Sequence, residues 1–197
     1  MRFFRKPVPD SELVPARRQA EAEERFTKAM NRALGYVTRS GQWRAARPAG
    51  TGLWTLLLEP TEAIPLPCDR DAVPWYLYAY LRFGFDVDDR PGLEGGSKVV
   101  TREYIYSLRV GHDSGGEVLT WHWHPGIPDA PDPHLHVRGV DHVDVPGLSD
   151  MHLPTSRVFF EDVLLFGIRN LGVRCQEGGV ENLEEMRLRT VRYASWR

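Results

Sequence analysis

The sequence predicts an α+β protein: a mostly antiparallel sheet with an N-terminal helix and a C-terminal helix packed on it. Two observations lead to this prediction. Apolar residues recur at helical spacing near both ends of the chain, whereas residues 53–140 form short alternating runs separated by proline and glycine. A block of strands flanked by helices is typical of the α+β class.

The first predicted helix runs from Pro15 to about Thr38. Pro15 suits the first helical position, and Gly41 marks the end of the helix. Its apolar residues recur three and four positions apart and form one stripe: Phe26, Ala29, Met30, Ala33, Leu34 and Val37. Residues 40–52 predict a loop or linker. We therefore divide the chain into a basic helical segment, residues 1–45, and a histidine-rich α+β domain, residues 46–197.

Five or six strands are expected between residues 53 and 140. The predicted strands are residues 53–59, 75–83, 99–110, 117–124 and 134–140. Gly115 and Gly116 predict a hairpin turn between the third and fourth of these, and residues 86–96 predict an acidic loop.

The run at residues 75–83 (WYLYAYLRF) alternates strictly between two faces. One face carries an arginine and three tyrosines: Tyr76, Tyr78, Tyr80 and Arg82. Such a row either stacks nucleobases or lies beneath a second layer of core or a helix packed on that face.

Helices are predicted again after the strands. Residues 160–171 form the first, with Glu161 and Asp162 in the turn where carboxylates favour the helix dipole and Gly172 at the C-terminal cap. Residues 182–193 predict a last amphipathic helix.

Composition and charge are those of an ordinary folded chain. Its 197 residues are 42 % hydrophobic and 26 % charged, which is enough for one domain with a core. Residues 1–50 carry eleven Lys and Arg against five Asp and Glu, although the net charge of the chain is -2. This basic segment suits an acidic partner, a phosphate backbone or the acidic remainder of its own chain.

The sequence excludes several classes of protein. Cys68 and Cys175 stand far apart with no further cysteine, so neither a disulfide framework nor a cysteine-based zinc site is expected. The N-terminus lacks the features of a signal peptide, and no apolar run approaches the roughly eighteen residues that span a bilayer. We expect a cytoplasmic protein with no membrane association.

The most informative feature is the histidines, all seven of which lie between His112 and His152. Four of them form two His-x-His pairs: His122 with His124, and His134 with His136. Residues two apart on a strand share a face, so each pair presents two imidazoles side by side. Two such strands would bring four imidazoles and Arg138 together.

Three interpretations of the histidines stay open. His122, His124, His134 and His136 suit zinc or another transition metal, with a carboxylate from Asp129, Asp132 or Asp141 as a further ligand. Alternatively, a pair of imidazoles acts as general base and general acid while Arg138 or Arg157 stabilises phosphoryl charge. In the third interpretation the histidines are structural and hydrogen-bond to loop carbonyls.

One resemblance to a known family covers residues 101–172. The motifs that carry it are, in order, Tyr104-x-Tyr106-x-Leu108, an aromatic-histidine strand, Pro133-His134-x-His136, His152-x-Pro154-Thr155-x-Arg157 and Glu161-Asp162-Val163-Leu164. This order resembles the TumE-like toxins of bacterial toxin–antitoxin loci. The resemblance implies a compact α+β toxin-like domain, a candidate ribonuclease neutralised by an antitoxin, with His134, His136 and His152 as the positions carried over.

The leading hypothesis is a toxin-like or defence-associated protein that acts on nucleic acid as a metal-independent endoribonuclease without a cofactor. Its expected partners are RNA and a protein antitoxin. The expected catalytic residues are His134, His136, His122, His124, His152, Arg138 and Arg157. The alternative is a non-enzymatic module that binds a metal or another protein.

Overall fold

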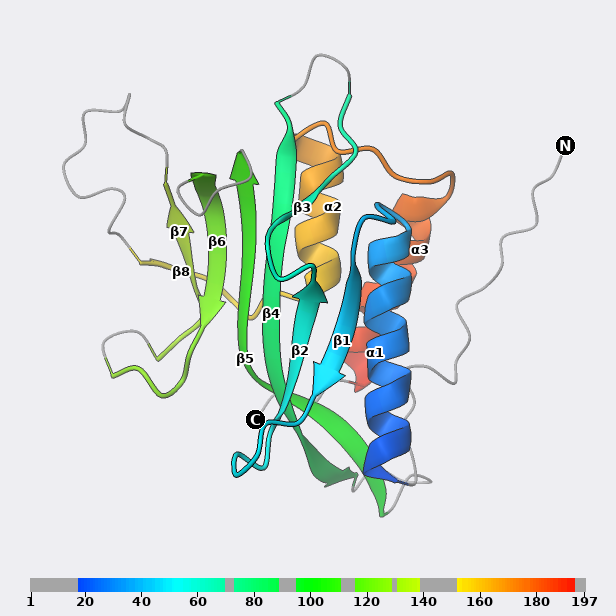
Figure 1. Cartoon of the computed structure of the whole chain (residues 1–197), viewed down its shortest axis with the longest axis vertical. Helices are drawn as coiled ribbons and strands as arrows, with labels where there is room; N and C mark the ends of the chain where they lie inside the picture. Colours follow the sequence, from blue (N-terminus) through cyan, green and yellow to red (C-terminus); the bar gives the residue numbers. More distant parts are fainter. Residues whose placement is uncertain are drawn as a thin grey trace, which may run out of the picture.

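The protein is described by a computed structural model, which covers residues 18–69, 73–88, 95–110, 116–128, 131–138 and 152–193. Within these ranges, eight strands form one antiparallel sheet and three helices pack beside it (Figure 1). The predicted α+β class is confirmed. Most of the predicted hairpin turn at residues 112–116 lies outside the described residues.

The sheet follows the chain closely, because neighbouring strands are mostly consecutive. The strands are β1 Gln42–Ala46, β2 Trp54–Glu59, β3 Ile64–Pro65, β4 Trp75–Asp88, β5 Gly96–Val110, β6 Glu117–Trp123, β7 His134–Val137 and β8 Leu153–Pro154. Their order is β1-β2-β4-β5-β6-β7-β8, and β3 pairs with β4. Every pair is antiparallel, the arrangement that neighbouring strands joined without a crossover adopt.

The prediction of a loop at residues 40–52 is wrong for β1. This strand pairs with β2 along its length, from Gln42 opposite Glu59 to Ala46 opposite Thr55. Its one large apolar side chain, Trp43, is buried, while both ends of the strand are exposed. One buried apolar residue does not produce the alternation of apolar and polar residues from which a strand is predicted. β1 also crosses the boundary proposed at residue 46.

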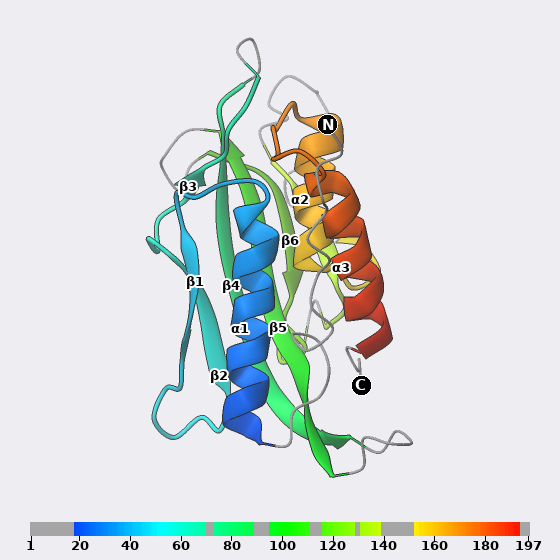
Figure 2. The same cartoon turned by 90° about the vertical axis from the view of Figure 1, so that its right-hand side faces the viewer.

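All three helices lie on one side of the sheet (Figure 2). They are α1 Gln19–Gly35, α2 Phe160–Asn170 and α3 Gly179–Tyr193. Phe26 of α1 packs edge-on against Phe83 of β4, with ring centroids 5.2 Å apart. Phe160 of α2 packs edge-on against Trp43 at 5.0 Å. These contacts bury the apolar face of the sheet, which is the core of the protein.

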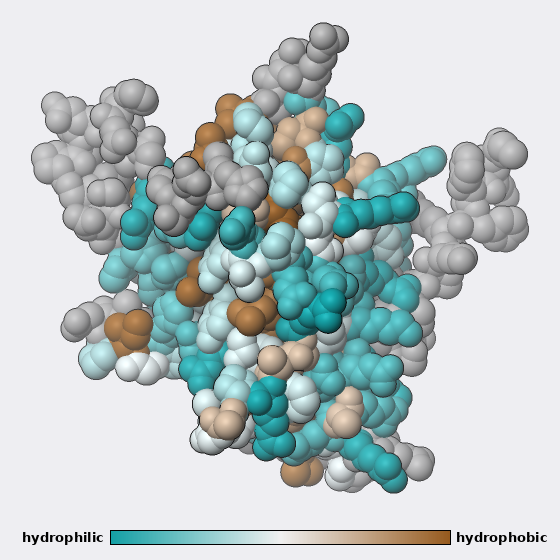
Figure 3. Space-filling view, in the orientation of Figure 1, coloured by the Kyte–Doolittle hydropathy of each residue, from teal (hydrophilic) through white to brown (hydrophobic). Residues whose placement is uncertain are grey.

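The opposite face of the sheet, called here the open face, carries the tyrosine row. Its side chains on β4 are only partly buried, in contrast to their strand neighbours Leu77, Ala79 and Leu81, which point into the core. No helix in the described ranges covers this face. Teal and pale residues predominate on it in Figure 3, with small separate brown patches.

None of the helices in the described ranges is long and apolar enough to cross a bilayer.

A buried carboxyl joins α2 to α3 and gives a first testable prediction. Glu161 is 4 % exposed, and its Oε1 accepts a hydrogen bond from Thr190 Oγ1 at 2.9 Å. Burial, with a smaller effect of the Asp162 charge, raises the pKa of Glu161 above its usual value. The folded state therefore holds this proton more tightly than the unfolded state, so its contribution to stability is lost as pH rises through the folded pKa.

Glu161→Gln should consequently increase the free energy of unfolding, because glutamine resembles the protonated acid and keeps a partner for Thr190. The gain should be larger at about pH 8 than at about pH 5. Urea denaturation at the two pH values measures it, with the exposed Glu177→Gln as the control. A variant less stable than the wild type at the higher pH would contradict the argument.

Candidate functional site

The pairing of β6 with β7 brings histidines from both His-x-His pairs together on the open face. His122 lies directly opposite His134, and Thr120 lies opposite His136. Because alternate residues of a strand share a face, His124 lies on the same face as His122. Trp121 points the other way, where its ring meets Phe166 of α2 at 5.6 Å.

Five imidazoles are in contact there, and they are called here the histidine cluster: His122, His124, His134, His136 and His152. The ring centroid of His122 lies 5.2 Å from His124, 5.6 Å from His134 and 4.9 Å from His136. His134 and His136 are 5.0 Å apart. The prediction that the two pairs meet on one face therefore agrees with the geometry.

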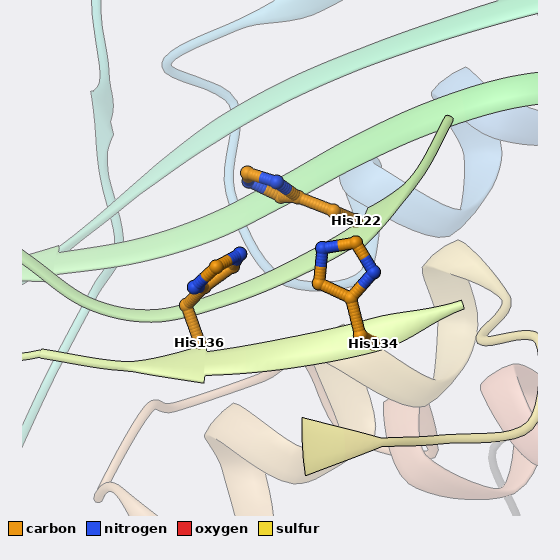
Figure 4. Close-up of side chains that lie close together, drawn as sticks. All are labelled: His122, His134 and His136. Atoms are coloured by element: carbon orange, nitrogen blue, oxygen red, sulfur yellow. The ribbon is translucent and has the colours of Figure 1, made fainter. Parts of the chain in front are cut away.

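Three members of the cluster converge more closely than the others. One ring nitrogen each from His122, His134 and His136 lies within 4.8 Å of the other two. Figure 4 shows these rings pointing toward a common space between β6 and β7. In a tetrahedral zinc site with Zn–N bonds of 2.0–2.1 Å, ligand nitrogens are about 3.4 Å apart. Small side-chain rotations would close that difference.

Hydrogen bonds fix the orientation of two imidazoles. His134 Nδ1 lies 2.8 Å from the backbone carbonyl of Asp132, and because a carbonyl only accepts, this nitrogen carries the proton. The Nε2 lone pair of His134 is then available to a ligand. An imidazole held from behind by a carbonyl or carboxylate is the usual arrangement of a metal-binding histidine.

His124 has the carboxylate version of this arrangement. Its Nδ1 lies 3.0 Å from Glu103 Oε1 on β5. The other oxygen of Glu103 accepts a hydrogen bond from Arg82 Nη1 of β4 at 3.1 Å. Arg82, Glu103 and His124 thus form a chain across three strands that ends beside His122.

His122 is neutral at physiological pH. Burial lowers its pKa to about 3, with further contributions from the charges of His136, His124, His134 and Arg138. A neutral imidazole is the form that binds a metal, whereas a general acid must carry the proton at the working pH. The electrostatics of His122 therefore favour a ligand over a proton donor.

The lowered pKa of His122 predicts an acid-sensitive fold for the metal-free protein. The unfolded chain takes up a proton on His122 below its ordinary pKa of about 6.5, whereas the folded chain does so only near 3. Stability should therefore fall as pH drops through this window. In urea denaturation at about pH 7 and about pH 5, His122→Gln should lose less stability than the wild type. Equal losses would show that His122 makes no such contribution.

The two predicted phosphate-binding arginines differ in position. Arg138 continues the face of His134 and His136, its backbone N–H donates to Val118 O at 2.8 Å, and its Nε lies 3.9 Å from Glu117 Oε2. Arg157 instead stacks on Trp123, with its guanidinium carbon 3.7 Å from the ring centroid. Since Trp123 points away from the open face, the structure does not bring Arg157 to the cluster.

The predicted carboxylate ligands are not at the cluster in the described residues. Asp132 contributes its backbone carbonyl to His134. Asp129 and Asp141 lie outside the described residues, as do His112 and His142.

Glu103 and Arg82 were not recognised from the sequence as partners of the histidines. The alternation of β5 does place Glu103 on the open face, because its neighbour Tyr104 points into the core. Placing it beside His124 requires the β5–β6 register, in which Tyr104 lies opposite Trp123. That register shifts between Leu108 and Arg109, so counting back from the turn would not have given it.

No family model, curated protein or solved structure matches this chain. The resemblance to TumE-like toxins stays a prediction.

Proposed function

We propose that this protein binds one divalent transition-metal ion, with zinc as the first candidate, through His122, His134 and His136. The observation that carries the proposal is the convergence of three imidazole nitrogens within 4.8 Å. Imidazole nitrogen is a preferred ligand of zinc, copper, nickel and iron, so the donor set selects this class over magnesium or calcium.

Three further features of the site support a metal. His134 is oriented by the Asp132 carbonyl, and His122 is neutral because its pKa is about 3. His134 and His136 are 6 % and 8 % exposed, so both side chains are buried instead of being free to change rotamer in solvent. Strands β6 and β7 fix the positions of the rings before any ion arrives, which lowers the entropy lost on binding.

The predicted ribonuclease remains a second candidate, favoured by one observation: Arg138 lies on the same face as His134 and His136, where a phosphate would meet both cation and imidazole. The low pKa of His122 excludes that residue as the general acid at neutral pH. RNA cleavage by the wild type that survives a chelator and is lost in His136→Ala would support this candidate.

Isothermal titration of chelator-treated protein with zinc chloride tests the proposed metal site. We expect one ion bound per chain in the wild type. His136→Ala, which removes one of three ligands, should weaken binding by more than about 100-fold. Tyr80→Phe, which removes one hydroxyl from the open face two strands away, is the matched control and should bind as the wild type does. Equal zinc affinity in His136→Ala and the wild type would refute the assignment.

A further inference from the structure

We propose that His152 is a fourth, exchangeable ligand of the metal held by His122, His134 and His136, and that a small anion or a free imidazole can take its place. This inference rests on the proposed metal site and adds to it the position at which external molecules reach the ion.

The register of the sheet edge places His152 beside the three ligands. β8 pairs with β7 so that Pro154 lies opposite His134 and Leu153 lies opposite Leu135. One further step of the same register puts His152 opposite His136, on the open face. The chain is held there by the hydrogen bond from Thr155 N–H to the carbonyl of Pro133 at 2.9 Å.

The distances agree with this placement. The ring of His152 lies 4.6 Å from that of His136 and 4.7 Å from that of His134, which are the shortest separations in the histidine cluster. His152 thus lies against the edge that His134 and His136 form. The ring nitrogens that lie within 4.8 Å of one another are those of His122, His134 and His136, so the ring of His152 has to turn to reach the same ion.

His152 differs from the other three in its exposure. His134 and His136 are buried and His122 is half-buried, whereas His152 is exposed. It precedes a strand of two residues, while His122 lies within the seven-residue β6. Among the described residues its ring packs on His134 and His136, and because it lies beyond the end of β8, turning it away from the metal breaks no strand pairing.

Exchange at this position has a chemical consequence. A zinc ion with four protein ligands is closed, whereas three protein ligands leave one position for water or substrate. The nearby carboxylates Glu103 and Glu117 are each paired with an arginine, Arg82 and Arg109 respectively. Neutral imidazoles leave the charge of the ion uncompensated, and this favours an anionic oxygen at the position that His152 vacates.

Absorption spectra of the cobalt(II)-loaded protein test the inference, because four-coordinate cobalt absorbs visible light more strongly than cobalt with additional water ligands. The wild type should give the intense spectrum. His152→Ala should still bind cobalt but with a weaker and shifted band, and added imidazole should restore the intensity. Tyr80→Phe, on the open face two strands away, is the control and should keep the wild-type spectrum. His124→Ala is measured beside it, because His124 is the remaining imidazole next to His122.

The outcomes separate the two proposals. Cobalt bound by the wild type and by His152→Ala with the same spectrum, unaffected by imidazole, overturns the role of His152 and leaves the three-histidine site standing. Failure of the wild type to bind cobalt or zinc overturns the site itself. If His124→Ala loses the intense spectrum and His152→Ala keeps it, the fourth ligand is His124, and the proposed role of His152 is refuted.

Discussion

Zinc should raise the melting temperature of the wild-type protein by about 5–10 °C at a free concentration 100 times its dissociation constant. A ligand that binds only the folded state contributes about 2.7 kcal/mol at this concentration. For a chain of this length, 1 kcal/mol shifts the melting temperature by about 2–4 °C. The effect is expected because the ion would connect β6 and β7, from which His122, His134 and His136 project.

His134→Ala should abolish this zinc-dependent shift. The variant loses an imidazole oriented by Asp132, and the two remaining ligands cannot hold the ion with comparable affinity. Differential scanning calorimetry with and without zinc measures the shift, and Tyr80→Phe again serves as the control. The melting temperature of each metal-free variant shows whether the substitution alone damages the fold. A zinc-dependent shift of the same size in His134→Ala would mean that the stabilising ion sits elsewhere.

Phe160→Ala should destabilise the protein by about 3–5 kcal/mol, the usual cost of truncating a buried phenylalanine. Phe160 is 1 % exposed at the first turn of α2. Its ring packs against Trp43 of β1 at 5.0 Å and against Tyr106 of β5 at 5.8 Å, so it joins two distant strands and a helix. The truncation would leave a cavity among large rings that cannot all move to fill it.

Chemical denaturation measures this loss, and Val191→Ala provides a comparison on α3, where the side chain is 48 % exposed. That substitution should change the free energy of unfolding by less than about 0.5 kcal/mol. A cost below about 1 kcal/mol for Phe160→Ala would contradict the close packing of α2 on the sheet.

Much of the fold follows from local patterns in the sequence. The strict alternation of β4 put Trp75 and Leu77 on the face opposite the tyrosine row, and both are buried. The apolar stripe of α1 predicted Ala29, Met30 and Leu34 as buried residues, which they are. These predictions succeed because a helix or strand that buries one face carries apolar residues at the period of that element.

Features that depend on distant pairing were not predicted. β1 has only Trp43 as an apolar anchor, and β8 has two residues, so neither has a period of its own. The contact between Glu103 and His124 depends on a shifted register. Arg157 was expected to stabilise phosphoryl charge beside the histidines, but its guanidinium stacks on Trp123 on the opposite face.

The shared face within each His-x-His pair follows from the two-residue period of a strand. The contact between the two pairs does not follow from the sequence, because a long connection separates β6 from β7 and no local pattern determines the register between them. Pairing of His122 with His134 puts the two pairs on one face, offset by two residues, so that His136 lies opposite Thr120. A shift of one residue would have sent His134 and His136 into the core.

X-ray absorption spectroscopy at the zinc edge of the zinc-loaded, full-length protein is the most direct test of the proposed metal site. The proposed site predicts a first shell of nitrogen from three or four imidazoles at about 2.0–2.1 Å, with multiple scattering from the rings and no sulfur. A first shell containing sulfur at about 2.3 Å, or oxygen alone, would place the ion away from His122, His134 and His136 and contradict the account.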